Sequence, residues 1–320
     1  MKEDWVIKKT IPGQNSPSLP IKPSWRRRLR RNVDGWLFAS PWILGFFFLT
    51  LGPMVASLGL SFTEWDLISP IKFIGLSNYQ ALLKDPLVAQ SLKVTIVYAV
   101  ASVPLHIIFG MLIALFLNTD IIGLRFYRTA FYLPSVLSGV AVALLWRWLF
   151  SPEFGLINSM LSSIGVRGPS WLGDPNWALP SLILMSVWSV GAGAIIYLAG
   201  LQGIPTDLYE AAEVDGARYW QRLFSITIPL MTPVLFFQLV MGLINALQVF
   251  TQAFIMTNGG PSNATLFAIL YLYQNAFTYQ RMGFASAFAW VLFLLILVLT
   301  LLVFRSSSNW VYYEGESRKS

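Results

Sequence analysis

Four neutral amide side chains recur within one apolar stretch, residues 229–256. They are Gln238, Asn245, Gln248 and Gln252. Their offsets of seven, three and four residues predict a single stripe along a helix. Amides both donate and accept hydrogen bonds, which suits the hydroxyl groups of a sugar and requires no buried charge. Interhelical hydrogen bonds that hold a bundle together would use the same groups, so a substrate path and a structural role both stay open.

Other candidate side chains lie outside this stripe. Another apolar stretch, 178–201, contributes Trp188, Ser189 and Tyr197, which would line the same path or pack and anchor the chain at a membrane interface. Arg147 lies between two tryptophans, where we expect it to extend its guanidinium to an interface rather than to attract an acidic cargo. His106 has no acidic partner nearby in its stretch, so a hydrogen-bonded packing role is favoured over proton relay.

The composition indicates which elements must position these residues. Of 320 residues, 56% are hydrophobic and only 12% are charged, whereas about a quarter are charged in soluble domains. The chain has no Cys and one His, which excludes disulfides, thiolate metal sites and a His-based metal centre. Nine of its 22 Lys and Arg residues precede residue 35, which indicates a membrane topology signal rather than a nucleic-acid groove. The sequence predicts an integral membrane protein.

Hydropathy predicts an all-α polytopic chain with six spans. They lie at about 36–62, 92–117, 127–150, 178–201, 229–256 and 283–304, each long enough to cross a bilayer. Residues 1–35 are expected to form a disordered basic tail that ends near the run WRRRLRRN, and residues 305–320 a second tail. The segment Asn258-Gly259-Gly260-Pro261 must turn.

The distribution of basic residues predicts the orientation. With the N-terminus inside, 16 of the 22 Lys and Arg residues fall on the cytoplasmic side and six do not. Six spans then return the C-terminus to the cytoplasm, together with the polar segment 202–228.

That polar segment reads PTDLYEAAEVDGARYWQRLFSITIPL over residues 205–230. Its apolar residues recur at spacings of three and four, as in an amphipathic helix, and its acids precede its bases, which suits the helix dipole. Gly216 is expected to break the segment into two short helices.

This segment resembles the EAA loop of binding-protein-dependent ABC importer permeases through Glu210-Ala211-Ala212, Gly216 and Ile226-Thr227-Ile228-Pro229. The resemblance implies a cytoplasmic coupling helix that docks into a groove on a separate ATPase subunit. We expect Leu208, Tyr209, Ala211 and Ala212 to fill that groove, Gly216 to permit the bend, and Glu210 and Asp215 to offer negative charge. An amphipathic loop lying on the bilayer surface is the alternative.

From about residue 36 to 304, the chain is similar to the sugar-importing branch of type I ABC permeases. The resemblance rests on Gly52-Pro53, Phe73 to Tyr79, Arg125 to Arg128, Trp146 to Phe150, Thr257 to Pro261 and Gly283 to Trp290. It implies a core permease region at about 91–304 and a prokaryotic cell membrane. The implied partners are a second permease, two ATPase subunits and an extracytoplasmic binding protein.

The chain carries no G-x-x-x-x-G-K-[ST] motif, so ATP and Mg would be used by the partner ATPases, and this chain would bind no cofactor and catalyse no reaction. Import of a non-sugar or acidic solute, such as glycerol phosphate or a uronic-acid oligosaccharide, stays open. An ion-coupled secondary transporter is less favoured, because no Asp or Glu lies clearly within a predicted span. A membrane enzyme would lack catalytic residues.

Overall fold

The computed structural model describes residues 25–119 and 122–312. The chain divides into two units, residues 1–56 and 57–320. The first contains α1 (Trp25–Gly45), the π-helical stretch η1 (Phe46–Leu51) and the start of α2 (Gly52–Leu60). Residues 25–35, which we expected in the disordered tail, already belong to α1, and residues 1–24 lie outside the described part.

The second unit is also predominantly helical. It begins with strands β1 (Thr63–Glu64) and β2 (Lys72–Phe73), followed by α3 (Ser77–Lys84), α4 (Pro86–Leu117), α5 (Leu124–Val136), α6 (Gly139–Leu149) and α7 (Leu156–Ser163). Then come α8 (Pro175–Val187), α9 (Gly191–Gln202), α10 (Thr206–Val214), α11 (Tyr219–Arg222), η2 (Leu223–Thr227) and α12 (Ile228–Leu247). The last elements are η3 (Ala253–Thr257), α13 (Ala268–Tyr273), η4 (Gln274–Thr278) and α14 (Met282–Ser307).

Four helical segments within the described residues are long and apolar enough to cross a membrane. They are Gly35–Leu60, Pro86–Leu117, Tyr219–Leu247 and Met282–Ser307. Two bent helix pairs, α5 with α6 and α8 with α9, raise this number to six if each pair forms one span. The predicted helical, multi-span character is confirmed, and the third and fourth predicted spans are not straight helices.

The third predicted span breaks sharply between α5 and α6, which meet at 98°. Pro134 in the last turn of α5 has no N–H to continue the helical ladder. Leu137 then adopts an extended conformation (φ −71°, ψ 144°) and Ser138 precedes the new helix. Hydropathy predicted one continuous element at 127–150 because both halves are apolar.

The fourth predicted span bends by 45° between α8 and α9. At this bend Gly191 meets the backbone of α5 so closely that a Cβ there would lie 1.8 Å from the carbonyl oxygen of Phe131. Only glycine allows that approach. The bend therefore brings α9 against α5.

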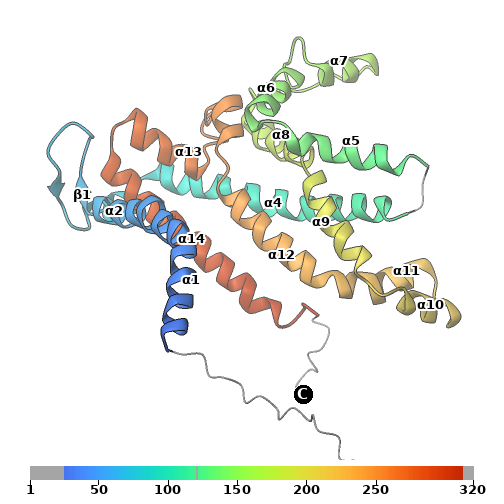
Figure 1. The fold of residues 1–320 in the computed structure, drawn as a ribbon. Helices are drawn as coiled ribbons and strands as arrows, with labels where there is room; N and C mark the ends of the chain where they lie inside the picture. Colours follow the sequence, from blue (N-terminus) through green and yellow to red (C-terminus); the bar gives the residue numbers. More distant parts are fainter. Residues whose placement is uncertain (1–24, 120–121, 313–320) are drawn as a thin grey trace, which may run out of the picture. The chain divides into compact units, whose positions relative to one another are not determined.

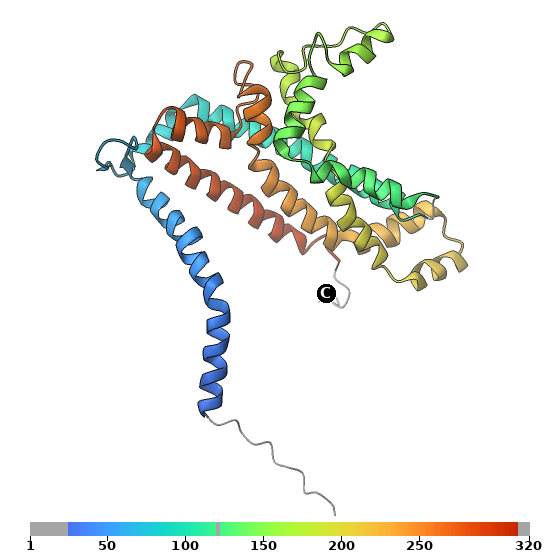
Figure 2. The ribbon, with the colours of Figure 1, turned by 45° about the horizontal axis from the view of Figure 1, so that its top comes forward.

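α4 is the central helix of the second unit and packs against α8, α9, α12 and α13 (Figure 1). Asp85 starts it by accepting a hydrogen bond from the N–H of Leu87 at 2.9 Å, with Pro86 at the first helical position. Tyr98 of α4 packs against Phe267 in the main apolar core, with the two ring centroids 5.1 Å apart. Figure 2 shows α12 and α14 side by side.

The connector between α2 and α4 is held by polar contacts. The Asn78 amide donates to the carbonyls of Ser61 and Thr63, both at 2.9 Å. Backbone N–H groups of Ser69 and Ile68 lower the pKa of Asp66 to about 2.

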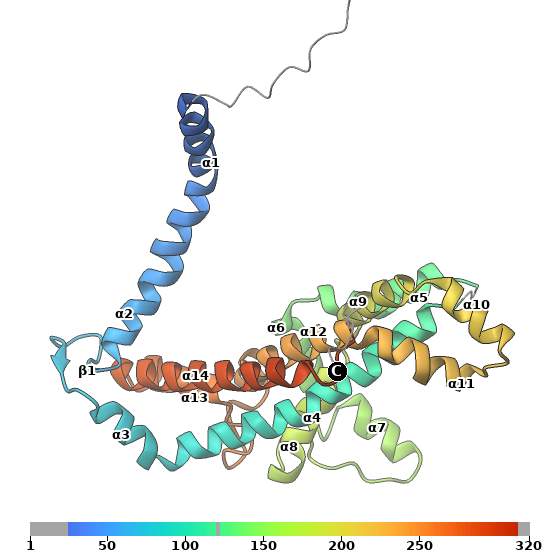
Figure 3. The ribbon, with the colours of Figure 1, turned by 90° about the horizontal axis from the view of Figure 1, so that it is seen from below.

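The end of the connector is also bonded to α13. The Tyr271 hydroxyl donates to Asp85 at 2.6 Å, and burial, together with that carboxylate, raises the pKa of Tyr271 to about 12. Figure 3 shows that this connector and α10 lie at opposite ends of the second unit.

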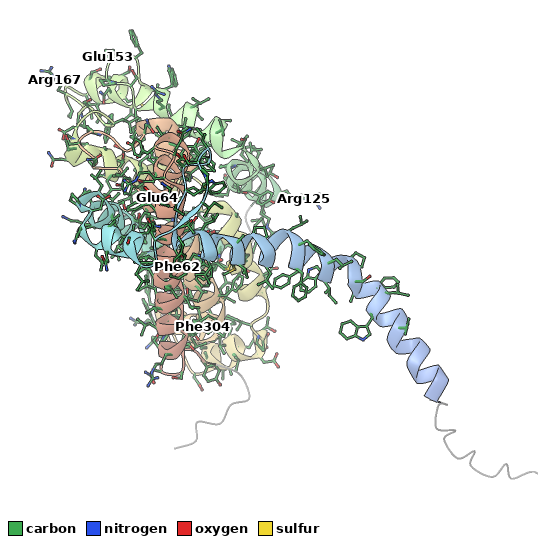
Figure 4. The ribbon with its side chains drawn as sticks, turned by 90° about the vertical axis from the view of Figure 1, so that its left-hand side faces the viewer. Phe62, Glu64, Arg125, Glu153, Arg167 and Phe304 are labelled. Atoms are coloured by element: carbon green, nitrogen blue, oxygen red, sulfur yellow. The ribbon has the colours of Figure 1, made fainter. Side chains whose placement is uncertain are left out.

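The C-terminal part of the chain returns to α12. α14 continues to Ser307, three residues beyond the predicted span. Phe304, labelled in Figure 4, makes an edge contact with Phe236 of α12 at 5.0 Å. The N–H of Tyr312 donates to the Thr232 hydroxyl at 2.8 Å, so the start of the predicted second tail is attached to α12. Residues 313–320 lie outside the described part.

Candidate functional site

α10 contains the motif Glu210-Ala211-Ala212, and a glycine four residues after Ala212 ends the helix. The N–H of Ala217 donates to the carbonyl of Ala212 at 2.8 Å, and the N–H of Gly216 donates to that of Glu213 at 3.0 Å. These two bonds form a Schellman motif, with Gly216 at φ +77° in the left-handed region. Asp207 in the first turn is favourable for the helix dipole. The motif thus encodes a short helix with a defined stop.

α10 is exposed on all sides except the one that carries Tyr209 and Ala212. Glu210, Ala211, Asp215 and Leu208 are exposed, the last with 40% of its area accessible, while Ala212 is half-buried. Val214, which no sequence motif indicates, is 89% exposed. The small side chain of Ala211 leaves the helix surface beside it accessible to a partner.

Tyr209 differs from the expectation that it fills a partner's groove. Its ring packs against the apolar cluster that includes Leu201 and Met231, and its hydroxyl lies 2.9 Å from the hydroxyl of Thr227 in η2. It therefore fixes α10 to the following helix. Arg222 donates to Glu213 at 3.1 Å, a second contact across the loop.

The second half of the segment is not a separate short helix as predicted. From Tyr219 the helix continues through η2 and α12 to Leu247. Its first turns expose Tyr219, Trp220 and Phe224, with the last two rings stacked at 6.2 Å. The spacing of four between Trp220 and Phe224 is the sequence signal for this aromatic surface.

A cavity of about 580 Å³ lies between α4, α5, α6, α8, α9 and α12. Its volume is in the range of small-molecule sites. Five of the six predicted pathway residues line it: Gln238, Asn245, Gln252, Trp188 and Tyr197. Ser189 lines it as well, whereas Gln248 is not among the lining residues.

The predicted amide stripe is wrong as a single helical row. α12 ends at Leu247, and Gln248 leaves the helix at φ −114°, ψ 22°. Gln252 belongs to the next helical stretch, which begins after a break at residues 248–250. Because of this break, Gln252 lines the cavity although it is not on the same helix as Gln238. Gln238 and Asn245, seven residues apart on α12, keep the predicted relation.

Several polar groups of the cavity already have partners. The Gln238 amide donates to the carbonyl of Gly193 at 3.3 Å, which leaves its oxygen as an acceptor. The hydroxyls of Ser135, Ser186 and Ser189 donate to carbonyls of their own helical turns at 2.6–3.0 Å. These serines therefore present mainly their oxygens to the cavity, whereas Asn245 and Gln252 contribute amides that can both donate and accept.

α4 contributes a row of lining residues that the sequence pattern does not predict for the cavity. Tyr98, Ser102 and His106 follow one another at intervals of four residues, and all three line it. The spacing was visible in the sequence, but only the packing of α4 shows which face it presents. Arg147 does not line the cavity; it is exposed and donates to the carbonyl of Ile255 at 3.3 Å.

The chain is similar to known membrane transport proteins. Residues 92–310 match the family described as "Binding-protein-dependent transport system inner membrane component". The "Probable ABC transporter permease protein YesP" of Bacillus subtilis is 47% identical over 296 residues, which cover 91% of this chain and 96% of that protein. The lactose transport system permease protein LacF of Rhizobium radiobacter is 36% identical over 291 residues, covering 87% and 96%.

Solved structures agree with these relatives. The chain is similar to a subunit of a bacterial ABC transporter that imports the acidic polysaccharide alginate, with a TM-score of 0.78 and 27% identity over 89% of this chain and 98% of that one. A bacterial alginate ABC transporter in complex with a periplasmic protein bound to an alginate pentasaccharide gives a TM-score of 0.79 at 26% identity, covering 88% and 96%.

Proposed function

This chain belongs to the family of binding-protein-dependent transport system inner membrane components, and we propose that it is the membrane-spanning subunit of an ATP-driven importer for a sugar or oligosaccharide. Energy would come from separate ATPase subunits that use ATP and Mg. A second permease would complete the pathway, and an extracytoplasmic binding protein would deliver the cargo.

The cavity carries this proposal. Its lining, which comes from six helices and the segments next to them, includes amides, hydroxyls and aromatic rings, a mixture that suits polyhydroxylated molecules. No lysine, arginine, aspartate or glutamate is among the described residues that line it. An uncharged sugar can therefore be bound without leaving an unpaired charge in the membrane interior.

The exposed face of α10 would be the coupling surface. Leu208, Ala211 and Ala212 would supply apolar contact, and Glu210 and Asp215 would interact with bases at the rim, where each exposed pair contributes only about 0–1 kcal/mol. Six spans, counting each bent pair as one, would place this face and both termini in the cytoplasm.

An acidic cargo is the second candidate. One relative named as a sulfoquinovosyl glycerol transport system permease protein (33% identical) and two solved neighbours named for alginate support it. A partner permease would then have to supply the cationic groups that this chain's cavity lining does not contain.

The proposal is tested by purifying the chain in mild detergent from its native membranes and reconstituting the complex in liposomes. We expect a second permease and an ATPase to co-purify, and ATP with the binding protein to drive uptake of one of lactose, maltotriose, arabinotriose or an alginate trisaccharide. Transport by the chain alone without ATP would refute the proposal. Competition between neutral and acidic sugars would separate the two cargo classes.

A further inference from the structure

His106 is the lining residue whose chemistry the proposed function does not yet use. It is the single histidine of the chain, it is half-buried, and it lies on the cavity face of α4. Two tight helix contacts on that face lie on either side of it. A Cβ at Gly242 of α12 would lie 3.3 Å from Val103, and one at Gly110 would lie 2.8 Å from the ring of Tyr197 on α9.

These two contacts define the side of α4 on which His106 lies. Val103 and Gly110 are three residues before and four residues after His106, so all three lie on one side of α4. Because α12 and α9 are packed against that side at both points, His106 lies between two close helix contacts. The cavity is the space left there, with Gln238 and Tyr197 also in its lining.

The hydrogen bond within α4 determines the tautomer. Nδ1 of His106 lies 2.7 Å from the carbonyl oxygen of Ser102. A carbonyl can only accept, so Nδ1 carries the hydrogen and donates. In the neutral ring, Nε2 then has a free lone pair. The contact with Ser102 thus orients the ring and sets Nε2 as an acceptor.

Nε2 differs chemically from the other polar atoms around the cavity. The hydroxyls of Ser135, Ser186 and Ser189 have their hydrogens engaged by backbone carbonyls. The amides in the lining each present donors beside their acceptor, whereas Nε2 of this tautomer can only accept. A sugar hydroxyl that enters the cavity needs an acceptor for its hydrogen, since a buried donor without one costs binding free energy.

We propose that His106 is a specificity-determining residue that accepts a hydrogen bond at Nε2 from one hydroxyl group of the transported sugar. This inference rests on the proposed function, because it names how one residue recognises the cargo of that same pathway. His106 orients no other group in this role; its ring contacts the cargo directly.

The test compares a sugar with its monodeoxy analogues in the reconstituted complex. The first step identifies which of lactose, maltotriose, arabinotriose or the alginate trisaccharide is taken up. Uptake of that sugar and of analogues that each lack one hydroxyl is then measured for the native chain, His106→Gln and His106→Leu. Glutamine keeps both a donor for Ser102 and an acceptor for the cargo, whereas leucine has neither.

We expect one analogue to have a KM about 3–10-fold above that of the parent sugar in the native complex. That difference should persist in His106→Gln and vanish in His106→Leu, where parent and analogue become equal. A purely structural role would raise the KM of parent and analogue together and preserve their ratio, so a preserved ratio in His106→Leu would overturn the inference. A complex that takes up a non-sugar solute with ATP and its binding protein, and none of these sugars, would instead overturn the sugar assignment, and this inference with it.

Discussion

Replacement of Gly216 by alanine tests whether the backbone geometry of the α10 turn is needed for coupling. Gly216 lies at φ +77°, where an L residue with a Cβ costs about 1–2 kcal/mol. No atom lies within 4 Å of the position a Cβ would take, so the cost is conformational and local rather than a collision. It corresponds to a reduction of about 5–30-fold in the equilibrium constant that favours the native turn over its alternatives.

The assay measures ATP-driven uptake per assembled complex in liposomes. Gly216→Asn is the matched control, because asparagine adopts the left-handed conformation more readily than alanine. We expect uptake to fall in the order glycine, asparagine, alanine, with the amount of assembled complex unchanged, since the turn is exposed and outside the apolar core. Native uptake by Gly216→Ala would refute the reasoning that this turn positions a coupling surface.

Three further substitutions probe other contacts. Tyr209→Phe removes the hydroxyl that contacts Thr227 and should loosen α10 by about 1 kcal/mol, seen as faster hydrogen exchange over residues 206–217; unchanged exchange would contradict it. Gln238→Ala should raise the KM for the transported sugar, whereas Gln248→Ala, outside the cavity lining, should not; equal effects would contradict the cavity assignment. Gly191→Ala should lower the free energy of unfolding by about 1–3 kcal/mol, because its Cβ would collide with the Phe131 carbonyl; an unchanged melting temperature would contradict that contact.

The local features of α10 could be predicted from the sequence. The spacing of four between Ala212 and Gly216 places the glycine where a Schellman motif requires a left-handed residue, and both of its hydrogen bonds span fewer than six residues. Tyr209 could not be assigned in the same way. Its position on an amphipathic helix does not reveal that Thr227, 18 residues later, lies against it.

The bends in the predicted spans could not be located from the sequence, because hydropathy reports how apolar a stretch is and not the direction of its helix axis. The stretches around Leu137 and around Trp188 to Val190 are apolar on both sides of the bend, and the Gly191 approach to Phe131 is a tertiary contact. The same limit applies to the amides. A helical spacing related Gln248 to Gln238, but the helix had already ended at Leu247. The sequence predicts a packing role for His106 because no acidic partner lies in its stretch, and no periodicity shows which face of α4 meets a cavity.

The central claim, that α10 couples this subunit to an ATPase, is tested most directly by site-specific cross-linking. The chain has no cysteine, so Ala211→Cys places one thiol on the exposed face of α10. Met160→Cys on α7, 62% exposed, is the control on a separate helix. In the complete complex we predict a cross-link from position 211 to the ATP-hydrolysing subunit and none from position 160. A complex that imports its sugar with ATP while position 211 cross-links only to lipid would contradict the account.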